Sequence, residues 1–461
     1  MTFSVEKLAA FACDCHGARL AEPVRRAAEL AVLDTVAAAL GGARTRNAVA
    51  ARLAARDTFG EGGAEVWFAQ ETMHKPGAIF ANCAAASALD VDDGHRGAAG
   101  HPGAAIVPAI LGEAPHCGAD GRDVLAAVAV GYDVALRVAS ARRRETRMSY
   151  ASGRWTGYGV AAAVGVLRRL PVDVIAHAIA IAGAEAPQNL PQGDSRTVSS
   201  VKGSSPWSTV TAIAAVDRAS RGGTGPVDLL DREQVYDVPT ITADLGVRWL
   251  INETYLKPYA SCRYTHPVLD AVFMLVSDHG VNVSAIKRLI VEIFPEARKI
   301  ANEVAPLTLE GAQFSLPFTA ALAVLRGRSA FRPMLEESLA DGEVLALARR
   351  VELVFSEEFA GAFPQQTPAR VSIVTAERTF TRTVLHPWGD VDNPMQTSAV
   401  EEKLRDLGAG LIDDDTANGL IAAVAELGEG NAHPLLQALA QPTAPHRGGV
   451  CAPTVRTSAV T

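Results

Sequence analysis

The chain has 461 residues, enough for two or three domains with a large hydrophobic core. Hydrophobic residues make up 48% and charged residues 20%, which excludes a disordered chain. Lys and Arg total 43 against 51 for Asp and Glu, a net charge of −8 that argues against nucleic acids and anionic membranes as partners. A small anionic substrate fits this balance where Lys, Arg and His cluster locally.

Two further features bear on the cellular location. The six cysteines are scattered, contain no CxxC pair and are too few for a disulfide framework, so a reducing cytoplasm is expected. The N-terminal segment lacks a basic start followed by an apolar core, and no apolar run reaches about 18 residues. We therefore predict a cytoplasmic protein with neither a signal peptide nor a membrane helix.

Residues 1–280 are expected to form the first part of a large all-helical domain. Apolar residues recur there at helical spacing, and the segments are rich in alanine, which allows helices to approach closely. The segment 22–40 ends at Gly41-Gly42, a typical C-terminal cap, and Pro76 opens another helix where its missing N–H costs nothing. The remaining helices predicted in this part span 123–141, 157–170, 172–184, 206–221 and 263–278.

The pattern changes in residues 281–392, which we predict to form a smaller α+β lid domain with a mainly antiparallel sheet. Residues 286–293 alternate apolar and polar side chains, as a half-buried strand does. Further elements are expected as strands at 351–355, 371–375 and 379–385 and as helices at 314–325 and 342–350. Residues 393–440 return to the helical domain, and 441–461 form a mobile tail. The predicted fold class is mostly α.

Several cofactor and catalytic motifs are absent from the sequence. It contains neither GxGxxG after a strand nor GxxxxGK[ST], so nucleotide binding has no support. It also lacks GxSxG, HExxH and a cysteine cluster that suits an iron–sulfur centre. If the protein is an enzyme, it is expected to work with side chains alone.

An acidic loop between two predicted helices is the first candidate for chemistry. Asp90, Asp92, Asp93, His95 and His101 place three carboxylates and two imidazoles within 12 residues. Helix capping and a turn would explain these residues without function. A divalent metal site is a second interpretation, because Asp and His are suitable ligands. Acid–base catalysis and substrate orientation are the third.

Two further segments carry lysines in suggestive settings. Lys257 begins a stretch that also holds Tyr, Cys, Arg and His just before a predicted helix, a combination suited to binding a carboxylate. For His266 in this stretch, helix capping is the favoured interpretation. Lys202 stands beside Gly203 before a helix opened by Pro206, where a side chain in a cleft and a solvated one are equally compatible with the sequence.

Taken together, these segments resemble the MmgE/PrpD family, which includes 2-methylcitrate dehydratase, cis-aconitate decarboxylase and iminodisuccinate epimerase. The motifs that carry the resemblance run in order through nearly the whole chain: ALDVDDGH, HPGAAIVPAIL, GYDVALRV, VKGSSPWS, LKPYASCRYTHPVLDA and NPMQTSAVEEKL. The resemblance implies a large helical domain with an α+β lid, a homodimer, and no metal or organic cofactor. It also implies a small carboxylate as substrate.

The resemblance also assigns roles to individual residues. It implies catalytic roles for Asp90, Asp93, His101, Lys202 and Lys257. Residues expected to contact the substrate are His95, Arg154, Trp155, Tyr259, Cys262, Arg263 and Phe318.

Four positions differ from the decarboxylase and epimerase pattern of the family. Trp155 falls in a segment where those relatives often carry a histidine, and Cys262 aligns with a histidine of the decarboxylases. Gly94 aligns with a threonine and Phe318 with a tyrosine. These differences weigh against decarboxylation and against a simple transfer of the epimerase activity.

The chemistry implied by the family is removal of a proton from a carbon next to a carboxylate. The resulting enediolate carries extra negative charge, which Lys202, Lys257, Arg263 or Arg154 would stabilise. A buried lysine or His101 would serve as base, and His101 could also protonate a departing hydroxyl, oriented by Asp90 or Asp93. We expect a hydro-lyase acting on a hydroxy di- or tricarboxylate such as 2-methylcitrate. The alternatives are an epimerase, a decarboxylase, a non-catalytic carboxylate-binding protein and a metal-dependent hydrolase.

Overall fold

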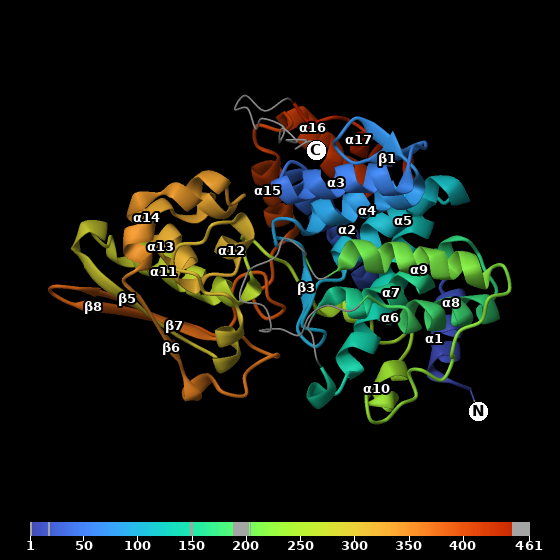
Figure 1. The fold of residues 1–461 in the computed structure, drawn as a ribbon, viewed down its shortest axis with the longest axis horizontal. Helices are drawn as coiled ribbons and strands as arrows, with labels where there is room; N and C mark the ends of the chain where they lie inside the picture. Colours follow the sequence, from blue (N-terminus) through green and yellow to red (C-terminus); the bar gives the residue numbers. More distant parts are fainter. Residues whose placement is uncertain (1, 17–18, 148–150, 188–201, 203, 445–461) are drawn as a thin grey trace, which may run out of the picture.

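The computed structural model describes residues 2–16, 19–147, 151–187, 202 and 204–444. The chain forms a large helical domain and a smaller α+β domain that lie side by side (Figure 1). The predicted fold class, mostly α with a smaller α+β domain, is confirmed. The predicted mobile tail from residue 441 falls almost entirely outside the described residues.

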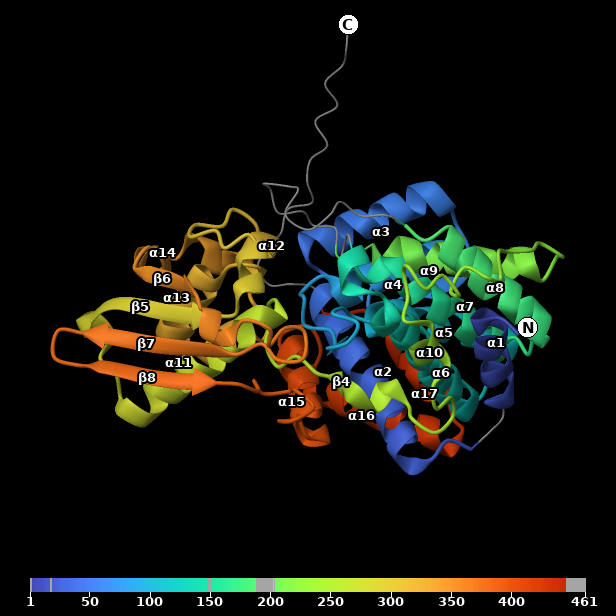
Figure 2. The same cartoon turned by 90° about the horizontal axis from the view of Figure 1, so that it is seen from below.

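The large domain combines segments from both ends of the chain. Its helices are α1 Ser4–Asp14, α2 Glu22–Gly42, α3 Arg46–Phe59, α4 Lys75–Ser87, α5 Gly103–Cys117, α6 Gly121–Ala141, α7 Thr156–Leu167, α8 Val172–Ala184, α9 Ser205–Ala219, α10 Val238–Thr242, α15 Thr397–Gly408, α16 Asp414–Glu426 and α17 His433–Leu439. Two short antiparallel pairs complete it: β1 Ala64–Val66 with β2 Glu71–Met73, and β3 Gly94–His95 with β4 Thr254–Tyr255. Figure 2 shows α15 and α16 beside α2, so the C-terminal helices return to the domain that the N-terminal helices begin.

Helix α6 is the central helix of this domain. By length and composition it could cross a membrane, but 94% of its most apolar stretch is buried inside the protein. It packs against α7 at a contact that glycine makes possible, because a Cβ atom on Gly159 would lie 2.1 Å from the carbonyl oxygen of Gly131. The small residues of both helices therefore allow the backbones to approach closely.

The smaller domain is a four-stranded sheet with helices on one face. Its strands are β5 Ile286–Ile293, β6 Val351–Phe355, β7 Ala369–Thr375 and β8 Thr379–Val384, in the order β6-β5-β7-β8. β5 runs parallel to β6, and the other two pairings are antiparallel. Its helices are α11 His266–His279, α12 Leu309–Gln313, α13 Leu316–Arg326 and α14 Gly342–Ala348. All four predicted strands are present, and β8 ends one residue earlier than predicted.

The contacts of α11 differ from the prediction that residues 1–280 belong to the large domain. This helix packs against β7, β8 and α13, so we assign it to the smaller domain. Helical periodicity could not reveal this, because it shows that a helix has an apolar face but not which partner covers that face.

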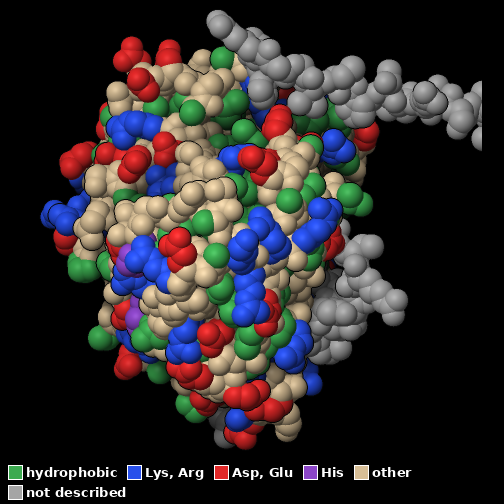
Figure 3. All heavy atoms as spheres, turned by 90° about the vertical axis from the view of Figure 1, so that its left-hand side faces the viewer, with side chains coloured by type: hydrophobic (Ala, Val, Ile, Leu, Met, Phe, Trp, Pro, Cys, Tyr) green, Lys and Arg blue, Asp and Glu red, His purple; other side chains and the backbone are tan. Residues whose placement is uncertain are grey.

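The outer end of the smaller domain mixes acidic and basic side chains, with hydrophobic ones scattered singly among them (Figure 3). An acid–base mixture of this kind is ordinary solvated surface. Charged side chains with a catalytic role are instead expected among the buried charged residues of the protein.

Candidate active site

A buried lysine is hydrogen-bonded to the acidic loop between α4 and α5. Lys403 on α15 donates from Nζ to the carbonyl oxygen of Val91 and to Oδ1 of Asp34 on α2, both at 2.6 Å. Lys403 and Asp34 are both fully buried. Just before Val91, Asp90 adopts a left-handed backbone conformation with φ of 52°, which aspartate tolerates better than most residues. Lys403 is not among the site residues that the sequence predicts.

The side chain of Asp93 is hydrogen-bonded to α5 and α6. Its Oδ1 accepts from the backbone N–H of Gly103 at 3.0 Å, and its Oδ2 accepts from the hydroxyl of Tyr132 at 2.8 Å. Burial, together with the nearby charges of Asp34 and Asp92, raises the pKa of Asp93 well above its usual range. The side chain therefore ties the loop to the start of α5.

His101 is oriented by a backbone carbonyl. Its Nδ1 lies 2.5 Å from the carbonyl oxygen of Asp93, and its backbone N–H donates to Oγ of Ser152 at 2.9 Å. Because a carbonyl oxygen only accepts, Nδ1 carries the hydrogen and Nε2 is left to exchange a proton. Nε2 lies 3.9 Å from Oδ1 of Asp90.

Lys257 and Asp90 form a buried ion pair beside this ring. Nζ of Lys257, which is fully buried, lies 3.2 Å from Oδ2 of Asp90. Burial alone would raise the pKa of Asp90, but the positive charges of Lys257, Lys202 and His101 outweigh it and lower that pKa to about 2. Asp90 is therefore a carboxylate at neutral pH. The β4 strand positions Lys257, because it ends at Tyr255, two residues earlier.

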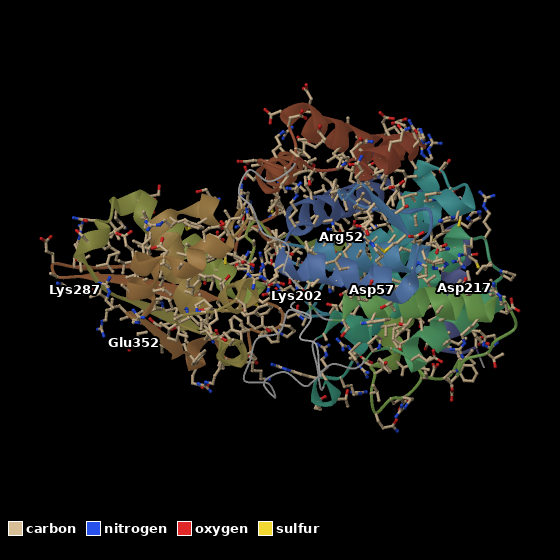
Figure 4. All side chains as sticks on the ribbon, turned by 45° about the horizontal axis from the view of Figure 1, so that its top comes forward. Arg52, Asp57, Lys202, Asp217, Lys287 and Glu352 are labelled. Carbon is tan, nitrogen blue, oxygen red and sulfur yellow. The ribbon has the colours of Figure 1, made fainter. Side chains whose placement is uncertain are left out.

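Lys202 approaches the same carboxylate at the boundary between the domains. Figure 4 shows Lys202 at the junction of the two domains. Its Nζ donates to Oε1 of Gln313 and lies 4.7 Å from the ring centre of Phe314. Burial lowers the pKa of Lys202. We call Asp90, His101, Lys202 and Lys257 the lysine cluster.

Cys262 and Gln313 border the lysine cluster. The backbone N–H of Cys262 donates to the carbonyl oxygen of Gln313 at 2.9 Å. Burial, reinforced by the charge of Asp90, raises the pKa of the Cys262 thiol to about 12, so the thiol is neutral. Sequence reasoning missed Gln313, because a buried amide ahead of a helix carries no pattern that marks it as functional.

Three other residues of the segment that begins at Lys257 bind partners outside the lysine cluster. They are Tyr259, Arg263 and His266. Arg263 donates to the carbonyl oxygens of Pro387 and Trp388 at 3.1 and 3.0 Å. The Tyr259 hydroxyl donates to Asp270 at 2.7 Å. His266 accepts at Nδ1 from Arg263 (3.1 Å) and donates from Nε2 to the carbonyl oxygen of Ser261 (3.2 Å), in keeping with a structural role. These polar groups join the segment to the rest of the smaller domain.

His95 and Phe318 also lie apart from the lysine cluster. His95 accepts at Nδ1 from the backbone N–H of Ala98 at 3.2 Å, and burial lowers its pKa to about 4. Phe318 is fully buried in the core, on α13. In both cases these surroundings are those of a packed structural residue.

Arg154 and Trp155 lie at the start of α7, near Ser152 and so near the backbone of His101. Arg154 is half-buried. Trp155 is fully buried, and its indole N–H has no hydrogen-bond partner among the described residues. Of the two, Trp155 offers a donor that the described part of the chain leaves unused.

The described residues contain no group of three or more His, Cys, Asp and Glu side chains arranged to hold a metal ion. What the lysine cluster offers chemically is positive charge in a largely buried setting, next to an imidazole whose Nε2 has no hydrogen-bond partner among the described residues. Such a setting stabilises negative charge more strongly than water does.

The fold and the site define a two-domain protein in which an α+β domain and a helical domain meet at the lysine cluster. Family models agree: the MmgE/PrpD N-terminal domain matches residues 6–244 and the MmgE/PrpD C-terminal domain matches residues 259–429. The chain therefore belongs to the MmgE/PrpD family, and the predicted resemblance is confirmed. The second match begins ahead of α11, in keeping with our assignment of that helix.

One curated relative is a cis-aconitate decarboxylase from Aspergillus terreus. It is 24% identical over 369 residues, which cover 73% of this chain and 75% of the relative. The family includes enzymes, which supports catalytic activity for this chain.

Proposed function

We propose that this protein is a cofactor-independent lyase that removes water from a small hydroxy di- or tricarboxylate, such as 2-methylcitrate. The observation that carries the proposal is the lysine cluster itself. The fully buried Lys257 and the partly buried Lys202 flank one buried carboxylate, and Nε2 of His101 lies 3.9 Å from that carboxylate. The ammonium groups of this cluster would lie beside the substrate carboxylate that gains negative charge when the enediolate forms.

The two lysines suit different tasks. Lys257 is paired with Asp90 and is held in place as a charged donor, so it is suited to stabilising the enediolate. Lys202 has a neutral amide as its hydrogen-bond acceptor, and burial lowers its pKa. A lysine of this kind is a suitable general base.

The elimination requires two proton transfers. The Lys202 amine takes the proton from the carbon next to a carboxylate, and the electron pair moves onto that carboxylate to give the enediolate. As the enediolate collapses, the electron pair returns to form the carbon–carbon double bond and the C–O bond to the hydroxyl breaks. Nε2 of protonated His101 donates its proton to the departing oxygen, and water leaves. Lys202 is left protonated and His101 neutral, so one proton transfer through solvent restores the enzyme. Arg154 is a proposed contact for a second carboxylate.

Decarboxylation is the second candidate, because the Aspergillus terreus relative bears that name. The same positive charge would stabilise the carbanion left when carbon dioxide departs. The site differs from the decarboxylase pattern of the family, however. Gly94 aligns with a threonine of that pattern, but here there is no room for a side chain. A Cβ atom on Gly94 would lie 2.3 Å from the hydroxyl oxygen of Tyr255.

Proton NMR in D₂O distinguishes these reactions. Chelator-treated protein is incubated with 2-methylcitrate, citrate, cis-aconitate, malate, tartrate and iminodiacids derived from aspartate. New vinyl signals, or water added across a double bond, would support the lyase. Loss of carbon dioxide would favour the decarboxylase, and exchange at the carbon next to the carboxylate without a new product would favour an epimerase. Binding without turnover would contradict an enzymatic function on these substrates.

The cytoplasmic location and the homodimer remain predictions. Sedimentation of the purified protein measures its oligomeric state directly.

A further inference from the structure

Two consecutive residues of the smaller domain hold Lys202 of the large domain. Gln313 is the last residue of α12, and Phe314 follows it directly. The amine of Lys202 donates to the Gln313 side chain and lies over the Phe314 ring. The position of Lys202 therefore depends on where the smaller domain sits.

The amide of Gln313 has only one orientation that satisfies both of its ends. Its Nε2 donates to the carbonyl oxygen of Ala88 at 3.3 Å, which leaves Oε1 to accept from Lys202. Gln313 is fully buried, so water cannot substitute for either partner. Its backbone carbonyl also accepts from Cys262. The side chain of Gln313 is thus bound to two groups of the large domain, while its backbone is bound to Cys262.

The charges that face Lys202 come from several elements and oppose one another. Asp90 and Asp92 of the acidic loop and Glu310 of α12 favour the charged amine, whereas Lys257 and burial disfavour it. Burial is the largest of these influences, and the pKa of Lys202 is lowered. Gln313 adds a hydrogen bond at this point without adding a countercharge.

We propose that Gln313 is a positioning residue that fixes the amine of Lys202 through a neutral amide, and so leaves that amine able to give up its proton. The contact itself is independent of any reaction. Its catalytic consequence rests on the proposed function, in which Lys202 is the base. A glutamate at position 313 would have the same side-chain length and would place a negative charge in contact with the Lys202 amine.

The first test measures Lys202 without a substrate. The protein is labelled with a trace of acylating reagent over a range of pH, and mass spectrometry quantifies the modification of each lysine. Gln313→Glu should raise the pKa of Lys202 by about one pH unit or more, because an opposite charge in contact favours the ammonium. Gln313→Leu should lower it, because the acceptor is lost. Unchanged labelling of Lys202 in both variants would overturn the proposal.

Two controls belong to this test. Gln437→Glu adds the same charge at an exposed position on α17 and should leave the labelling of Lys202 unchanged. The exposed Lys287 on β5 serves as an internal reference in every sample. An equal change at Lys202 in the Gln437→Glu control would also overturn the proposal, because overall charge and not the contact would then be the cause.

The second test uses the substrate found by NMR. In Gln313→Glu the acidic limb of the pH–rate profile should move to higher pH. At neutral pH, kcat should then fall about tenfold for every pH unit that the limb has moved. KM should change less than kcat. If the labelling changes and the profile does not, Lys202 is not the base: the proposed mechanism fails, while its positioning by Gln313 stands.

Discussion

Replacing Lys403 by methionine tests how the acidic loop is held. The change removes both hydrogen bonds of the buried amine, to Asp34 and to the carbonyl oxygen of Val91. Removing one partner of a buried pair leaves the other charge uncompensated and costs about 3–5 kcal/mol. For a cooperative unit of about 300 residues this lowers Tm by on the order of 5 °C.

The loss should depend on pH in a defined direction. Burial raises the pKa of Asp34 even beside Lys403, whose charge acts to lower it. Without Lys403 the folded protein binds a proton at Asp34 more readily than the unfolded chain does. The free energy of unfolding of Lys403→Met should therefore fall as the pH rises, and the variant should be less destabilised near about pH 5 than near about pH 8.

Urea unfolding of the wild type, Lys403→Met and the double variant Asp34→Asn with Lys403→Met supplies the measurement. The double variant has no lone buried charge, so it should recover about 2 kcal/mol or more at the higher pH. A single variant that loses less than about 1 kcal/mol would refute the reasoning. So would a double variant as unstable as the single one at both pH values.

Three further predictions concern the site. Lys257→Met should lower turnover about 10²–10³-fold. Lys257→Arg should not restore it, because the planar guanidinium group does not fit the site of a compact ammonium group. Unchanged product formation by NMR would contradict this role. His101→Asn should lower turnover at least about 10²-fold, because the amide cannot exchange a proton as the imidazole does, and near-wild-type turnover would argue against proton exchange at His101. Gly94→Ala should lower the free energy of unfolding by about 1–3 kcal/mol, because its methyl group collides with Tyr255, whereas Gly419→Ala meets nothing within 4 Å and serves as the control. Equal urea midpoints for the two glycine variants would refute the packing argument.

The fold could be predicted largely because its signals are local. Alternation over 286–293 and capping at Gly41-Gly42 concern neighbours in the chain, and the predicted elements appear close to their expected bounds. The domain that contains α11 could not be predicted in the same way. Its partners β7 and β8 lie about a hundred residues further along the chain, and a helical pattern does not identify them.

The site shows the same division. The sequence points to Asp90, His101, Lys202 and Lys257 because chemically reactive residue types stand in loops, and the structure brings these four together. The orientation of Asp93 could not be anticipated, since it depends on Tyr132, which lies 39 residues further along the chain. Lys403 lies within the NPMQTSAVEEKL motif, but nothing in the sequence marks Lys403 or Gln313 as a residue that holds other groups, because that depends on burial.

The return of the chain to the large domain also sets the order in which the protein can be completed during synthesis. Helix α2 packs against α15, and the N–H of Phe68 bonds to the carbonyl oxygen of Leu439 at 2.9 Å, so early and late segments complete each other. The smaller domain is nearly continuous in sequence and leaves the ribosome before α15 does. The acidic loop gains its hydrogen bond from Lys403 only after α15 has been synthesised. A nascent chain of this protein can therefore carry a complete sheet domain while the part of α2 that α15 covers is still exposed, and this is the stage at which a chaperone has most to protect.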